Sequence, residues 1–210
     1  MKGLGFPGSI AVLMAALCTV PAAAQTQDDA AARIALDNFA RCVVQHKPVE
    51  SLRVLNRDFR TNGYRTGLRL LATEAGNDCA YDHVGANRGL RSSNLLMAGA
   101  IAENWLERAD APVNVRITRA AGATVETYAP TDAVAQCLVR SMPDQVGTLF
   151  AAEAGGAAET AAAEGFMAAV GPCASATNVT ARIDLTIPAL RAVLATAALR
   201  LVAQAENTGA

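Results

Sequence analysis

Two cysteine-framed segments constrain the fold of this chain more than any other feature of its sequence. They span Cys42–Cys79 and Cys137–Cys173 and are nearly equal in length. Aligning residues 37–55 with residues 132–150 matches an aspartate, an alanine, a cysteine, a valine and a proline at equivalent places. The sequence therefore predicts an internal duplication, in which one helical unit occurs twice.

Residues 1–24 predict a secretory signal peptide. Lys2 precedes an apolar run through Ile10–Val20, and small residues lead up to Ala24, which is the three-part layout of such a peptide. We expect cleavage after Ala24, removal of Cys18 with the peptide, and no transmembrane segment afterwards. The protein is then periplasmic or secreted, in a compartment where cysteines oxidise.

The composition of the chain favours an all-α fold. Aromatic residues make up only 4% of it and alanine is abundant, which suits helices better than a β-sandwich. The net charge of -1 gives no reason to expect nucleic acid as a partner.

Apolar periodicity, prolines and glycines place four helices in each half. The expected ranges are 28–45, 48–60, 64–75 and 90–108 in the first half, and 131–140, a helix starting at 143, 157–170 and 186–205 in the second. A proline opens the second helix of each half because the first helical turn tolerates it. Gly171 and Pro172 are expected to end the third helix of the second half.

The predicted organisation is two tandem, pseudo-symmetric four-helix units, residues 25–109 and 131–210. Residues 110–130 between them are rich in threonine and partly alternate apolar with polar residues. We therefore interpret this segment as a linker with room for a short hairpin.

The duplication selects one pairing of the four remaining cysteines. An even number of cysteines outside the cytoplasm is most simply a disulfide framework, and four cysteines allow three pairings. If each half arose as a unit, its two cysteines pair within it, as Cys42–Cys79 and Cys137–Cys173. In the chain-entropy model, each bridge then stabilises the fold by about 4 kcal/mol.

A metal site is the alternative use of the same thiols. Cys42 and His46 are four residues apart, and Cys79 and His83 repeat that spacing. Two thiolates and two imidazoles are a set that binds zinc. The second half has hydroxyl residues in place of both histidines, and oxidation competes for the thiols. We therefore predict disulfides, with no metal and no cofactor.

A row of arginines forms a candidate surface for an anion or a partner. Its members follow helical spacing and are Arg53, Arg57, Arg60, Arg65 and Arg69. Guanidinium groups hold carboxylates and phosphates, so the row suits an anionic ligand or an acidic partner, although a solvated face is the plainer interpretation. A third interpretation pairs it with acidic residues of the other half, for example Arg57 with Glu159.

An apolar stripe on the fourth helix is the other candidate site. Met97, Ile101 and Trp105 belong to it. Such stripes usually form core, and the alternative is an apolar ligand pocket or a partner groove. No catalytic residue is predicted, because the chain contains no Gly-x-Ser-x-Gly motif and bridged cysteines are not nucleophiles.

The segment Phe39–Val44 with the proline that follows it, Cys79 and the segment Leu90–Glu103 resemble a family of small exported bacterial proteins with a cysteine-framed helical repeat and no assigned activity. The resemblance implies export and a helical repeat, and it transfers no functional residue. The sequence favours a non-enzymatic binding or scaffolding protein whose partner is an envelope protein. The alternatives are a carrier of a small apolar or amphipathic ligand and an unrecognised hydrolase.

Overall fold

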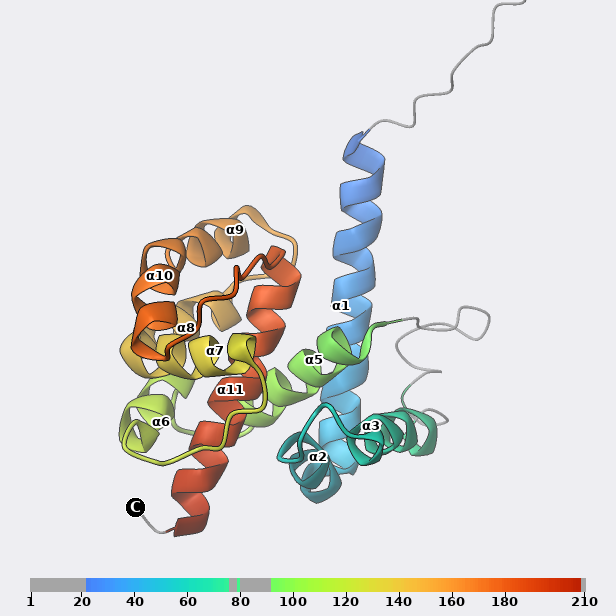
Figure 1. Cartoon of the computed structure of the whole chain (residues 1–210). Coiled ribbons are helices and arrows are strands. Elements are labelled where there is room, and N and C mark those ends of the chain that lie inside the picture. The colour runs from blue at the N-terminus through green and yellow to red at the C-terminus, as the bar shows by residue number, and fades with distance from the viewer. Residues whose placement is uncertain (1–21, 76–78, 80–91, 209–210) are drawn as a thin grey trace, which may run out of the picture.

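The structure is a computed structural model that describes residues 22–75, 79 and 92–208. These residues form helices joined by loops (Figure 1), and no strand occurs among them. The predicted all-α class is therefore confirmed. Most of the predicted signal peptide and His83 lie outside the described residues.

The first unit contains α1 (Ala22–His46), α2 (Pro48–Leu55), α3 (Asn62–Glu74) and α5 (Asn94–Glu107). Pro48 starts α2 as expected, but this helix ends at Leu55 and does not reach Arg60. The helix ends because nearby side chains hydrogen-bond to backbone N–H groups that would otherwise belong to a longer helix. Asp58 accepts a hydrogen bond from the backbone N–H of Arg60, and Thr61 caps α3 by accepting one from the N–H of Tyr64.

The second unit contains α7 (Pro130–Ser141), α8 (Pro143–Ala151), α9 (Ala157–Glu164), α10 (Met167–Ala176) and α11 (Ile187–Thr208). The single helix expected over residues 157–170 is wrong, because the chain breaks between α9 and α10. The expected stop at Pro172 is also wrong, since α10 continues through it. Pro172 and Ala168 are exposed, so water can bind the carbonyl that loses its helical partner.

The expected hairpin between the units is replaced by a helix, α6 (Val113–Ala120). Ile117 and Ala120 are buried on one face of it, and α6 packs on α8 and α11. The partial alternation of apolar residues in this segment was the misleading signal. Spacing of three and four residues describes the buried face correctly.

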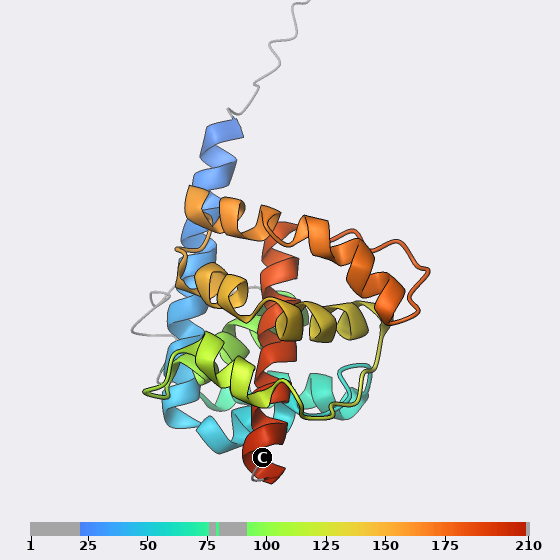
Figure 2. The same ribbon diagram turned by 90° about the vertical axis from the view of Figure 1, so that its left-hand side faces the viewer.

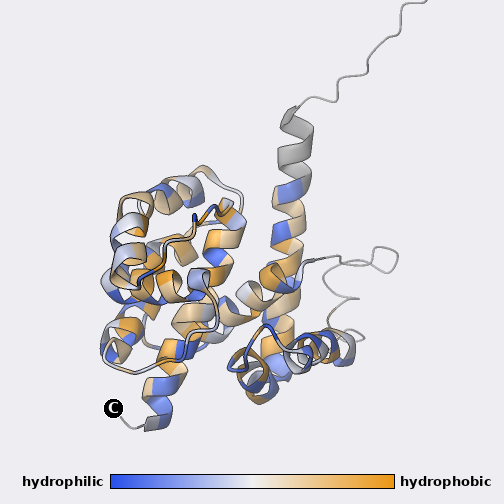
Figure 3. Cartoon of the chain, viewed as in Figure 1, coloured by the Kyte–Doolittle hydropathy of each residue, from blue (hydrophilic) through white to orange (hydrophobic). Residues whose placement is uncertain are grey.

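The two units meet where α5 crosses α11 (Figures 1 and 2). The helices approach so closely that a Cβ added to Gly99 would lie 2.4 Å from the Cβ of Ala192. Within the described residues, α11 is the helix long and apolar enough to cross a membrane, but 67% of its most apolar window is buried inside the protein. Figure 3 shows α11 becoming hydrophilic at its C-terminal end.

One disulfide closes each unit, as predicted. Cys42 is bonded to Cys79 and Cys137 to Cys173, and the Cα atoms are 5.6 Å apart in both pairs. Such bonds persist in oxidising compartments outside the cytoplasm.

Candidate functional site

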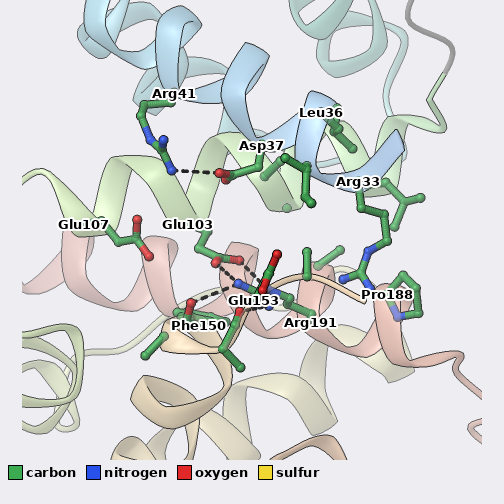
Figure 4. A pocket seen from close by; sticks show the side chains of 18 residues that line it. Arg33, Leu36, Asp37, Arg41, Glu103, Glu107, Phe150, Glu153, Pro188 and Arg191 are labelled. Carbon is green, nitrogen blue, oxygen red and sulfur yellow. Dashed lines mark hydrogen bonds and ion pairs between the residues drawn. The ribbon is translucent and has the colours of Figure 1, made fainter. Parts of the chain in front are cut away.

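Among the described residues, two cavities of different chemistry are lined by side chains from both units. The first, which we call the polar cavity, has a volume of about 360 Å³. Its walls come from α1, α5, α11 and residues 150–154 (Figure 4). Charged side chains from all three helices point towards one another across it.

Arg191 on α11 is the centre of the polar cavity. Its Nε donates to Glu103 Oε2 at 2.9 Å, and its Nη2 donates to Glu103 Oε1 and to the Phe150 carbonyl at 3.0 Å. Its Nη1 donates to the Ala152 carbonyl at 2.8 Å and to Glu159 Oε1 at 3.1 Å. A guanidinium has five N–H donors. All five therefore have acceptors, and none is left for a ligand.

Glu159 on α9 joins this network to the first unit. Arg33 on α1 donates to both of its carboxylate oxygens, and the N–H of Gly155 donates to Oε2 at 2.8 Å. Gly155 lies in a turn with φ of 81°, a conformation that favours glycine. Burial alone would raise the pKa of Glu159, but the hydrogen bonds from Arg33 and Gly155 outweigh it and lower the pKa.

Glu103 on α5 is the second buried carboxylate of the network, with a side chain that is 8% exposed. Burial raises the pKa of Glu103 to about 7, against the opposing effect of Arg191. Burial would lower the pKa of Arg191, but its bonds to Glu103 and Glu159 raise it. Arg191 therefore keeps its charge at neutral pH.

The third arginine of the polar cavity, Arg41, is also engaged. It donates to Asp37 at 2.8 Å and to Asn104 at 3.2 Å. Because each arginine that lines the cavity is paired with a carboxylate, we interpret this cluster as the contact that fixes the two units relative to one another.

The second cavity, which we call the apolar cavity, has a volume of about 290 Å³. Its lining from the first unit includes Leu55, Phe59 and Tyr64, and its lining from the second unit includes Leu185 and Val193. Apolar walls with a few polar groups are typical of small-molecule sites.

The polar groups of the apolar cavity centre on Arg200, which is 5% exposed. Its Nη1 donates to both oxygens of Asp132 at 2.9 Å, and its Nη2 donates to the Glu126 carbonyl. Its guanidinium carbon lies 4.5 Å from the centre of the Tyr128 ring. Within the described part of the chain, Nε donates to no protein acceptor. A buried guanidinium thus retains an N–H donor at the cavity wall.

Tyr64 is the second polar group with unused capacity. Burial raises the pKa of its hydroxyl to about 12, so the phenol stays neutral and both donates and accepts. Its hydroxyl makes no hydrogen bond to another described residue.

Met97, Ile101 and Trp105, the residues for which an apolar pocket was the alternative to core, line neither of the two cavities. Ile101 is fully buried, and Met97 packs against the core. The indole N–H of Trp105 donates to the Pro48 carbonyl at 3.3 Å, and Arg116 stacks on its ring. These residues belong to the core, and the apolar cavity lies elsewhere.

All five arginines of the predicted basic row are exposed. Arg60 pairs with Asp58 at 2.8 Å, and Arg57 donates to the Gly63 carbonyl at 3.5 Å. The suggested pairing of Arg57 with Glu159 does not form, because Glu159 binds Arg33 and Arg191 instead. The row therefore remains a surface feature of α2, α3 and the loop between them.

The thiols of the alternative metal set are consumed by the first disulfide. His46 nevertheless lies beside it: a ring nitrogen of His46 and the two sulfur atoms of Cys42 and Cys79 are all within 4.8 Å of one another.

Sequence reasoning missed Glu103, Arg191 and Arg200 as members of these sites. The available signal was a charged residue inside an apolar helix, because such a residue is rarely buried without a partner.

Comparisons of the chain with protein-family models, curated proteins and solved structures found no match.

Proposed function

We propose that this protein is a non-enzymatic, exported, disulfide-stabilised binding protein, and that the apolar cavity holds a small amphipathic ligand. The observation that carries the proposal is a cavity of about 290 Å³ with apolar walls and an unused donor on the buried Arg200. The signal-like residues 1–24 and the two disulfides support a periplasmic or secreted location.

The apolar walls select the body of the ligand. Leu55, Phe59, Leu185 and Val193 come from both units, so a hydrocarbon chain in the cavity would contact both. Transferring apolar surface out of water stabilises a complex by about 25 cal/mol per Å². The volume lies near the lower end of the range for ligand pockets, about 300–1,000 Å³, which suits a ligand with one short chain.

The charge balance selects the polar end of the ligand. Asp132 already neutralises Arg200, and a carboxylate brought beside this pair would be repelled by Asp132. A hydroxyl or carbonyl oxygen can instead accept from the free Nε of Arg200 or bind the hydroxyl of Tyr64. The site therefore favours a neutral head group over an ionised one.

The polar cavity supports ligand binding less well, since the donors of Arg191 are all engaged. An envelope protein that binds the exposed arginine row stays a prediction from the sequence.

Calorimetric titration of the full, oxidised chain with 1-decanol tests the proposal, with decanoate and decyltrimethylammonium as charged counterparts of equal chain length. We expect one site per chain and the highest affinity for the alcohol. A saturating ligand should also raise the free energy of unfolding, by about 2.7 kcal/mol at one hundred times its dissociation constant.

Filling the cavity supplies the matched control. Val193→Trp places an indole in the cavity, whereas Val49→Trp makes the same change at a position that is 61% exposed and lines neither cavity. The first should abolish binding and the second should leave it unchanged. Leu185→Trp blocks the cavity from a loop and serves if Val193→Trp does not fold. Wild-type affinity in a folded blocked variant, or no binding by the wild type, would overturn the proposal.

A further inference from the structure

The two disulfides have the same Cα–Cα distance of 5.6 Å but differ in the side chain beside their sulfur atoms. Cys42 and His46 are one helical turn apart on α1, so they share a face. In the second unit Ser141 stands one turn after Cys137, and its hydroxyl lies 3.9 Å from Cys137 Sγ. It donates to the Cys137 carbonyl at 2.8 Å. Only the first disulfide therefore has a zinc-binding side chain next to its sulfur atoms within the described residues.

We propose that the first unit contains a redox-gated zinc site made of Cys42, His46 and Cys79. In the oxidised protein the two sulfur atoms are bonded to one another and cannot bind metal. After reduction, two thiolates and one imidazole bind one Zn²⁺, and water takes the fourth position. Zinc sites with two cysteines, one histidine and an open position are established chemistry.

The chemical steps balance with a dithiol as reductant. The dithiol transfers two electrons and two protons to the Cys42–Cys79 bond, which breaks into two thiols, and the dithiol becomes its own disulfide. Zn²⁺ then replaces the two thiol protons, which pass to solvent. In the reverse direction, an external disulfide takes two electrons from the two thiolates and two protons from solvent and becomes a dithiol. The Cys42–Cys79 bond forms again and Zn²⁺ passes to solvent.

The positions of the donor atoms fit this site. Zn–S bonds of about 2.3 Å and Zn–N bonds of about 2.0 Å in a tetrahedron place ligand atoms about 3.5–3.8 Å apart. The three donor atoms already lie within 4.8 Å of one another, so small side-chain rotations are enough. Cys42 and Cys79 are buried, and His46 is exposed. The metal would therefore sit at the surface end of the bridge, with solvent access for its water.

Zinc and the disulfide would close the same chain segment in different redox states. Both tie α1 to Cys79, so the first unit keeps a cross-link when its sulfur atoms are reduced. The second unit has no such substitute. This inference is independent of ligand binding in the apolar cavity.

The full chain, reduced with a dithiol and freed of it by gel filtration under nitrogen, provides the test. We expect one equivalent of Zn²⁺ per chain in competition with a chelating dye, and release of two protons. Co²⁺ should give thiolate charge-transfer bands and the d–d bands of a tetrahedral ion. The oxidised chain should bind neither metal at this site.

Two reciprocal substitutions distinguish zinc binding that needs the histidine from zinc binding by two thiolates alone. His46→Ser copies the second unit and should weaken zinc binding at least tenfold, while Ser141→His copies the first unit and should add a second equivalent. Folding of both variants is checked in their oxidised forms by circular dichroism. No zinc binding by the reduced wild type, unchanged affinity in His46→Ser, or no gain in Ser141→His would each overturn the proposal.

Discussion

Arg191 on α11 binds the carboxylate of Glu103 on α5 through Nε and Nη2, across the interface of the two units (Figure 4). The same guanidinium reaches Glu159, which also binds Arg33 on α1. A pair buried to this extent does not necessarily stabilise a fold more than apolar residues would, but removing one partner leaves an uncompensated charge.

Replacing Arg191 with methionine should therefore destabilise the protein strongly. Arg191→Met leaves Glu103 buried without its partner, and we expect the free energy of unfolding to fall by about 3–5 kcal/mol. Urea denaturation at pH 7 measures the change. Arg182→Met is the control, because that side chain is 88% exposed and its partner among the described residues is Asp184 at 3.4 Å; it should cost less than about 1 kcal/mol. Equal effects of the two substitutions would contradict the assignment.

Glu103 should make stability depend on pH in an unusual direction for a carboxylate. Burial raises its pKa to about 7 from the ordinary value of 4.5, so between these pH values the folded protein holds a proton that the unfolded chain has released. The free energy of unfolding that Glu103 contributes then falls as pH rises from 4.5 to 7.

Urea denaturation of wild type and Glu103→Gln across this pH range measures the effect. The free energy of unfolding of Glu103→Gln should increase relative to that of the wild type as pH rises. Movement in the other direction would mean that Arg191 lowers the pKa of Glu103 by more than burial raises it.

A methyl group at the crossing of α5 and α11 should be poorly tolerated. In Gly99→Ala the new Cβ would lie 2.4 Å from the Cβ and 2.5 Å from the Cα of Ala192, so the helices must separate. We expect a loss of at least about 1–3 kcal/mol, the usual cost of overpacking. Gly122→Ala meets nothing within 4 Å and should keep the wild-type midpoint of urea denaturation. A neutral Gly99→Ala would show that this crossing is loosely packed.

Each disulfide should contribute a similar amount to stability. The bridges span 37 and 36 residues, and in the chain-entropy model loops of this length are worth about 4 kcal/mol each. Replacing both cysteines of one bridge with alanine, once per unit, and measuring urea denaturation without added metal tests this. If the free energy of unfolding falls in one variant and stays unchanged in the other, the bridge removed in the unchanged variant closes a segment that is already ordered without it.

The sequence carried enough information for the helical class and the disulfide pairing. Repeated spacing of Cys42, Cys79, Cys137 and Cys173 selected the pairing that the structure confirms. Prolines also predicted where the second helix of each unit starts. These features depend on local backbone preferences and on the similarity of the two halves, both of which a single sequence displays.

Features that depend on tertiary contacts were harder to predict. The helix α6 becomes stable because Ile117 is buried against the second unit, and its eight residues would be marginal alone. Likewise, the sequence shows Arg200 only as a charged residue that interrupts an apolar helix. The structure shows that it is buried against Asp132 and Tyr128. The partners of such residues are distant in the chain, so spacing alone does not identify them.

The buried charges that connect Arg33, Glu159, Arg191 and Glu103 also govern how the protein melts. Separating the two halves would break these ion pairs together with the packing of α5 on α11, so we expect the two halves to melt together. Calorimetry should accordingly record one cooperative heat-absorption peak, and a lesion in either half should displace that single peak without splitting it.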